Sequence, residues 1–226
     1  MSPLLEARDV GKTFGRTVAL RGASLTIGAG EIVAISGPSG SGKSTLLHCL
    51  AGILAPDEGE IRYGETRLDQ LDEDTRTRLR RAAFGVVLQF GGLVPELTAA
   101  ENVAVALMFG GLGRAEASAT AREWLGRLGV DDCAPVRPGD LSGGQVQRVA
   151  LARALAHGPK VVFADEPTGA LDSVAGEEVL GLLLAAARER GTTVVMVTHD
   201  NRIAAFADRE IVVRDGGVVD APAVPR

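Results

Sequence analysis

Short runs of consecutive apolar residues recur along the chain and predict strands that are buried on both faces. A parallel strand covered on both sides loses the alternation of apolar and polar positions. Four runs show this pattern: Glu31–Ser36, Phe84–Leu88, Val161–Ala164 and Thr193–Thr198. Helical patterns follow several of them, as over Ser44–Leu50 and Ser173–Arg190. We therefore expect an α/β fold with a mostly parallel sheet.

A different pattern near the start predicts an antiparallel β patch. Apolar and polar residues alternate over Leu5–Val10 and Ala19–Ile27, as is typical of antiparallel strands. Gly59–Tyr63 is expected to be a further short strand. The segment Gly11–Gly15 is expected to connect the first two. Its aromatic residue, Phe14, either fills the core or offers a flat ring on which a base can stack. Its position alone favours the core.

Residues 91–140 read as a helical insert within the α/β domain. Helices are expected over Ala99–Phe109 and Ala115–Leu128, and Thr98 and Glu101 match the capping-box spacing of the first.

The first helix of this insert carries more apolar residues than one buried stripe requires. Such a surplus fits a protein-binding groove, with Leu107 or Met108 as docking residues. The alternative is that the insert packs the whole surplus internally.

The composition limits the number of domains and the classes of function that the chain can have. The chain has 226 residues, of which 46% are hydrophobic, and this suits one domain over residues 1–226. The net charge of −5 gives no support to nucleic-acid binding. Cys49 and Cys133 form no ligand spacing and are expected to be buried or free thiols. We expect no secretory signal, and no apolar run approaches the ~20 residues that cross a bilayer.

One stretch carries the clearest chemistry, because it fits the phosphate-binding pattern G-x-x-x-x-G-K-[ST]. Its glycines let backbone N–H groups converge on an anion, its lysine adds a full positive charge, and its serine hydroxyl suits Mg²⁺. The pattern predicts binding of ATP phosphates by Gly37, Pro38, Ser39, Gly40, Ser41, Gly42, Lys43, Ser44 and Thr45.

Polar residues follow the apolar runs at the point where each run ends. Ligands of open α/β sheets bind at the carboxyl ends of the strands, so these residues are expected to converge on one nucleotide. Asp165 and Gln89 are candidates near Mg²⁺, and Glu166 is the candidate general base. His199 is a candidate residue for polarising the γ-phosphate or holding the attacking water. The alternative is that these residues merely cap strand ends.

A second potential anion site precedes another amphipathic helix. Ser142 is a good N-cap, and Gly143 and Gly144 leave the following N–H groups open, ahead of Gln145. An ordinary helix start explains the same residues equally well. One nucleotide, however, would hardly need two such sites.

Together these residues resemble the ATP-binding-cassette (ABC) ATPases. The stretch Leu141–Gln145 looks like their signature motif, Gln89 like the Q-loop glutamine, and Asp165 with Glu166 like the Walker B pair. Ala170–Asp172 looks like the D-loop, His199 like the switch histidine, and Phe14 stands at the aromatic A-loop position. The resemblance runs from about Leu4 to Val219.

The resemblance implies a head-to-tail homodimer that holds MgATP between the P-loop of one copy and the signature of the other. It also implies a membrane permease as partner, and a cytoplasmic location on the inner face of the membrane through that permease.

The stretches Leu93–Val103 and Asp165–Asp172 look like the macrolide-exporter and lipoprotein-release branch, although Val146 and Gly91–Gly92 depart from it. Three alternatives stay open: a mechanical regulator of cell-wall hydrolases or cell division, an uptake ATPase, and a cassette protein of translation or DNA repair.

Overall fold

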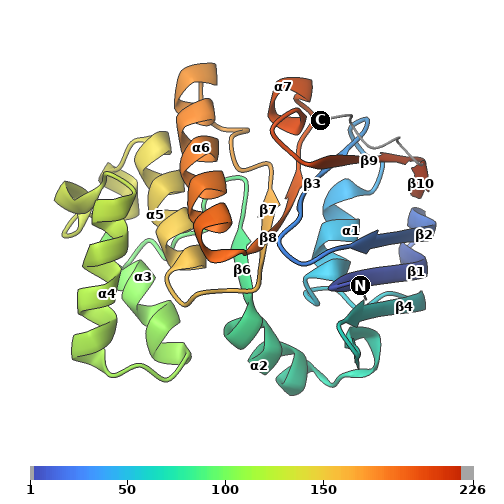
Figure 1. Ribbon diagram of the computed structural model, residues 1–226, viewed down its shortest axis with the longest axis horizontal. Helices are drawn as coiled ribbons and strands as arrows, with labels where there is room; N and C mark the ends of the chain where they lie inside the picture. The colour runs from blue at the N-terminus through green and yellow to red at the C-terminus, as the bar shows by residue number, and fades with distance from the viewer. Residues whose placement is uncertain (1–2, 220–226) are drawn as a thin grey trace. The chain divides into compact units, whose positions relative to one another are not determined.

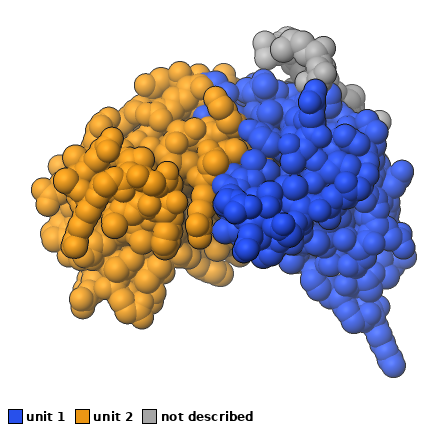
Figure 2. Space-filling view, turned by 90° about the horizontal axis from the view of Figure 1, so that it is seen from below, with its two compact units in different colours: residues 1–80, 191–226 blue, residues 81–190 orange. Residues whose placement is uncertain are grey.

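The computed structural model describes residues 3–219, which divide into two compact units (Figure 2). Within the described residues, unit 1 comprises residues 3–80 and 191–219, and unit 2 comprises residues 81–190. Within the described part of the chain, no helix is both long and apolar enough to cross a membrane.

An antiparallel sheet in unit 1 has the strand order β2-β1-β4-β5. Its strands are β1 (Leu5–Phe14), β2 (Thr17–Ile27), β4 (Glu58–Tyr63) and β5 (Thr66–Arg67), followed by the 3₁₀ turn η1 (Leu68–Gln70). The expectation that Gly11–Gly15 connects two shorter strands is wrong, because β1 continues to Phe14. Irregularities in the β1–β2 register absorb the extra residues.

Phe14 does not fill the core. Its side chain is 48% exposed, and the Lys12 ammonium lies 5.7 Å from its ring centroid. The Asp57 carboxylate anchors this end of β1 by accepting hydrogen bonds from Lys12 Nζ and Thr13 N, both at 2.7 Å. The Lys12 hydrogen bond is also the main reason that the pKa of Asp57 is lowered.

The parallel strands of unit 1 are organised around β3 (Ile32–Ser36), which is buried along its whole length. It pairs in parallel with β8 (Thr193–Val197) and β9 (Arg209–Arg214), and β10 (Gly217–Val219) pairs antiparallel with β9. The helices α1 (Lys43–Leu50) and α7 (Asn201–Ala204) belong to the same unit. The helix α2 (Glu73–Ala83) crosses the sequence boundary between the units.

Unit 2 contains a parallel strand pair and the main group of helices (Figure 1). The pair is β6 (Phe84–Val87) and β7 (Val161–Asp165). The longer helices are α3 (Ala99–Phe109), α4 (Arg114–Arg127), α5 (Gly143–Leu155) and α6 (Ser173–Arg190), with 3₁₀ turns η2 (Asp131–Cys133) and η3 (Pro138–Asp140). The two expected insert helices are therefore confirmed, the second shifted by one residue.

Local sequence explains where α3 begins. The Thr98 hydroxyl accepts from the N–H of Glu101 at 3.3 Å, and the Glu101 carboxylate accepts from the N–H of Thr98 at 2.8 Å. The expected capping box is thus present. Further along unit 2, α5 lies so close to β6 that a Cβ on Gly85 would be 2.3 Å from the carbonyl oxygen of Ala154.

Candidate functional site

The predicted phosphate loop joins β3 to α1 in unit 1, as its sequence pattern requires. Its three glycines all have positive φ, and two of them lie against the backbone of other strands. A Cβ on Gly37 would lie 2.1 Å from the carbonyl oxygen of Val213, and one on Gly42 would lie 2.3 Å from that of Ala19. Because any larger residue would collide with backbone at both positions, the loop path depends on glycine here.

The loop places a buried cation and a buried hydroxyl near the start of α1. Lys43 is 6% exposed, and its Nζ donates to the carbonyl oxygens of Gly37 at 2.9 Å and Pro38 at 2.7 Å. The Ser41 hydroxyl is buried without a hydrogen-bond partner among the described atoms. A buried donor without a partner is costly, and a phosphate oxygen would satisfy it. These residues therefore fit a bound phosphate chain.

His199 lies at the same sheet edge as this loop. In the β3–β8 ladder, Ile35 pairs with Val197, so the carboxyl ends of the two strands are side by side. This register agrees with the prediction that His199 converges with the phosphate loop on one nucleotide. Ser44 occupies the first turn of α1, directly after Lys43.

Unit 2 brings two further predicted residues into direct contact. In the β6–β7 ladder, Val87 pairs with Ala164, so Gln89 and Glu166 both follow neighbouring strand ends. The Gln89 Nε2 donates to the Glu166 Oε2 at 3.1 Å. Glu166 has φ +46°, a conformation that non-glycine residues adopt at a cost and that clusters at functional sites.

Asp165 is the last residue of β7 and is half-buried. In the described part of the chain, no group of three or more His, Cys, Asp or Glu side chains is placed to hold a metal ion. Mg²⁺ in nucleotide sites needs no such cage, because one or two carboxylates act with phosphate and water oxygens. Asp165 therefore fits the expected role as a single carboxylate ligand.

The second predicted anion site begins α5, as expected. Ser142 and Gln145 form a capping box, in which the Ser142 hydroxyl accepts from the N–H of Gln145 at 3.3 Å. A Cβ on Gly144 would meet nothing within 4 Å, so the space beside this helix start is open. The first-turn N–H groups of a helix have no partner inside the helix, so they favour an anion in that space.

Two residues of α5 were not predicted from the sequence, although they hold the segment around Gln89. Gln147 and Arg153 are polar positions within a helix that is otherwise largely buried. Arg153 donates to the carbonyl oxygens of Gly91 and Gly92, both at 2.8 Å. Burial lowers the pKa of its guanidinium. A polar residue interrupting an apolar helical face was the only available signal.

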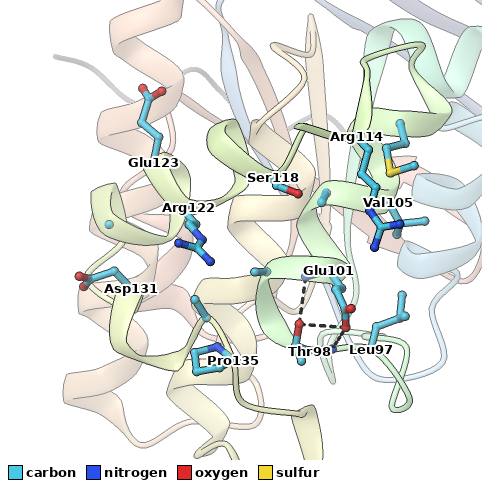
Figure 3. A pocket seen from close by; sticks show the side chains of 15 residues that line it. Leu97, Thr98, Glu101, Val105, Arg114, Ser118, Arg122, Glu123, Asp131 and Pro135 are labelled. Carbon is cyan, nitrogen blue, oxygen red and sulfur yellow. Dashed lines mark hydrogen bonds between the residues drawn. The ribbon is translucent and has the colours of Figure 1, made fainter. Parts of the chain in front are cut away.

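A groove of about 980 Å³ lies in unit 2 between α3 and α4 (Figure 3). Met108 lines it and is 42% exposed, whereas Leu107 is 1% exposed. The expectation that Leu107 is a docking residue is therefore wrong, since its side chain belongs to the core. Other lining residues are Leu97, Glu101, Val105, Arg114 and Arg122.

Comparison with known proteins places these features in a family. A family model described as ABC transporter matches residues 20–169. The macrolide export ATP-binding/permease protein MacB of Shigella flexneri is 46% identical over 98% of this chain and 35% of its own length. The chain thus spans about a third of that relative. The lipoprotein-releasing system ATP-binding protein LolD of Geobacter metallireducens is 43% identical over 97% of this chain and 99% of its own length.

Solved structures of similar proteins are also ATP-binding cassettes. The ATP-binding cassette MJ0796, in a dimeric post-hydrolysis state with ADP and Pi, is 41% identical with a TM-score of 0.91, covering 98% of this chain and 99% of that chain. The protein cbiO1 of Clostridium perfringens is 30% identical with a TM-score of 0.85, over 97% of this chain and 88% of that one. These matches confirm the expected fold class.

Proposed function

The chain belongs to the ABC transporter family, and we propose that it supplies the ATP-driven step of a bacterial exporter or mechanotransmission system. As a member it is an ATPase domain that uses ATP, with Mg²⁺ as the usual partner ion of the family. The contact between Gln89 and Glu166 is the observation that carries the proposal for hydrolysis. It joins an amide and a carboxylate at the ends of neighbouring strands, where the family places its chemistry.

Each site residue has a proposed role. Residues 37–45 bind the phosphates, Phe14 stacks on adenine, and Ser44, Gln89 and Asp165 hold Mg²⁺. Glu166 accepts a proton from the attacking water, and His199 contacts the γ-phosphate. The bound Mg²⁺ would neutralise charge on the β- and γ-phosphates. Ser142, Gly143, Gly144 and Gln145 contact the nucleotide of a second copy in a head-to-tail dimer. Dimeric cassettes among the solved relatives support this last role.

The assignment of Glu166 is tested by Glu166→Gln. The amide is nearly isosteric but cannot accept the proton, so turnover should fall by about 10²- to 10⁴-fold while ATP binding persists. The variant should also accumulate an ATP-bound dimer, measured by size exclusion. Glu177→Gln removes an exposed carboxylate from α6 and should leave turnover unchanged. Normal turnover in Glu166→Gln would show that another group is the base.

We also propose that the whole of residues 1–226 acts as one nucleotide-binding domain coupled to a membrane permease. The domain would sit on the cytoplasmic face of the membrane through that permease. The names of both relatives support this arrangement, since MacB is an ATP-binding/permease protein and LolD belongs to a lipoprotein-releasing system.

The groove between α3 and α4 is the proposed docking site for a cytoplasmic segment of the permease. Its lining combines apolar side chains such as Val105 and Met108 with two arginines and three acidic residues, Glu101, Glu123 and Asp131, so an apolar segment that carries charges of both signs would fit. Most of the length of the MacB relative lies outside the part that this chain matches, so that relative has room for a permease.

Met108→Glu tests the docking site. A carboxylate in the groove should abolish co-purification with the permease while leaving the basal ATPase rate unchanged. Val219→Glu, at a similarly exposed apolar position on β10, is the matched control and should still co-purify with the permease. Retained co-purification in Met108→Glu would place the docking surface elsewhere.

A further inference from the structure

One buried amide on α5 contacts the main chain on both sides of the Gln89–Glu166 hydrogen bond. Gln147 is 1% exposed, and its Nε2 donates to the carbonyl oxygens of Gln89 and Pro167, both at 2.9 Å. The carbonyl oxygen of Leu88 is a third, longer contact at 3.4 Å. A primary amide has two N–H groups, so the two short contacts account for its full donor capacity.

The positions of the two acceptors are specific. One belongs to Gln89 itself, and the other belongs to the residue that directly follows Glu166. The Gln147 side chain therefore fixes the spacing of the two backbone segments whose side chains meet at 3.1 Å. Glu166 also has a left-handed backbone, which persists only where the surroundings hold it in place.

We propose that Gln147 is a positioning residue for hydrolysis, which holds Gln89 and Glu166 in register from the helix that begins at Ser142. This proposal rests on the assignment of Glu166 as the base. Gln147 is buried and acts through backbone carbonyls, so nucleotide binding by the phosphate loop should not depend on it.

The test compares catalysis with binding in two variants. Gln147→Leu removes both donors at similar volume. Turnover should fall by roughly 10- to 100-fold, because small displacements of catalytic groups have effects of that size. The dissociation constant for a fluorescent ATP analogue should stay within about twofold of wild type, since the phosphate loop is unchanged.

Gln147→Glu gives a second readout that a purely structural role would not produce. A carboxylate at this position donates nothing and faces carbonyl oxygens, whereas a protonated carboxyl can donate one hydrogen bond. The ratio of its turnover to that of wild type should therefore rise as pH falls from 8 to 6. A ratio that does not change with pH would count against the proposal.

Val149→Ala is the matched control, because it removes fully buried volume from the same helix without touching either carbonyl. An equal loss of turnover in this control would reduce Gln147 to a packing residue. Turnover within twofold of wild type in Gln147→Leu would overturn the proposal. Glu166→Gln separates the two hypotheses: if it is inactive while Gln147→Leu is normal, only the positioning role fails, and if it is active, the assignment of the base fails.

Discussion

Replacing Phe14 with alanine separates stacking on a base from a role in stability. The Phe14 side chain is 48% exposed at the end of β1, and its main charged neighbour is Lys12. Lys12 keeps its own partner after the substitution, since its Nζ is also paired with Asp57 at 2.7 Å. The substitution therefore removes an exposed ring without leaving an unpaired buried charge.

The two effects are distinguished because one is measured as Tm and the other as ATP affinity. Full burial of a large apolar side chain is worth ~1.5–3 kcal/mol, so a half-exposed ring contributes about 0.8–1.5 kcal/mol. For a chain of this size, that corresponds to a fall in Tm of roughly 2–6 °C. Stacking on a base is worth ~1–3 kcal/mol, so ATP affinity should weaken by roughly 5- to 150-fold.

The assay measures ATP binding and competition by inorganic tripolyphosphate, which carries the phosphates without a base. Phe14→Ala should weaken the binding of ATP and leave the binding of tripolyphosphate unchanged. Val18→Ala is the control. Val18 is 40% exposed and pairs with Thr13, while Phe14 pairs with Thr17, so Val18 points to the opposite face of the hairpin. Intact ATP affinity together with a large loss of stability in Phe14→Ala would refute the stacking role.

Three further predictions concern the phosphate loop, the dimer and the thiols. Lys43→Ala should abolish tight MgATP binding, measured with a fluorescent ATP analogue, because the loop then faces a tetra-anion without its lysine; unchanged affinity would remove Lys43 from the site. Gly144→Asp should still bind ATP but neither dimerise nor hydrolyse it, and mixing it with Lys43→Ala subunits should restore one composite site; failure to bind ATP across that mixed dimer would argue against the head-to-tail arrangement. Burial raises the pKa of Cys49 to about 11 and also raises that of Cys133, so alkylation at pH 8 should require opening of the fold, and rapid modification of the native protein would contradict this.

Features that depend on neighbouring residues in the chain were predictable from the sequence. The phosphate loop is one, because glycine at positions 37 and 42 sets a backbone path that few other residues permit. The start of α3 is another, since Thr98 and Glu101 satisfy each other three residues apart. The buried strands β3 and β8 follow from unbroken apolar runs.

Features that depend on residues far apart in the chain were decided by tertiary packing. Met108 and Leu107 are both apolar neighbours on α3, so only packing against other helices makes one a groove residue and the other core. Gln147 lies 58 residues from Gln89 and 20 from Pro167, and no local pattern joins them. The sequence indicated candidate residues for the chemistry, because such candidates follow from side-chain type and nearby spacing. The residues that hold them in place act through backbone carbonyls, which every residue possesses, so the sequence does not show which segments Gln147 and Arg153 contact.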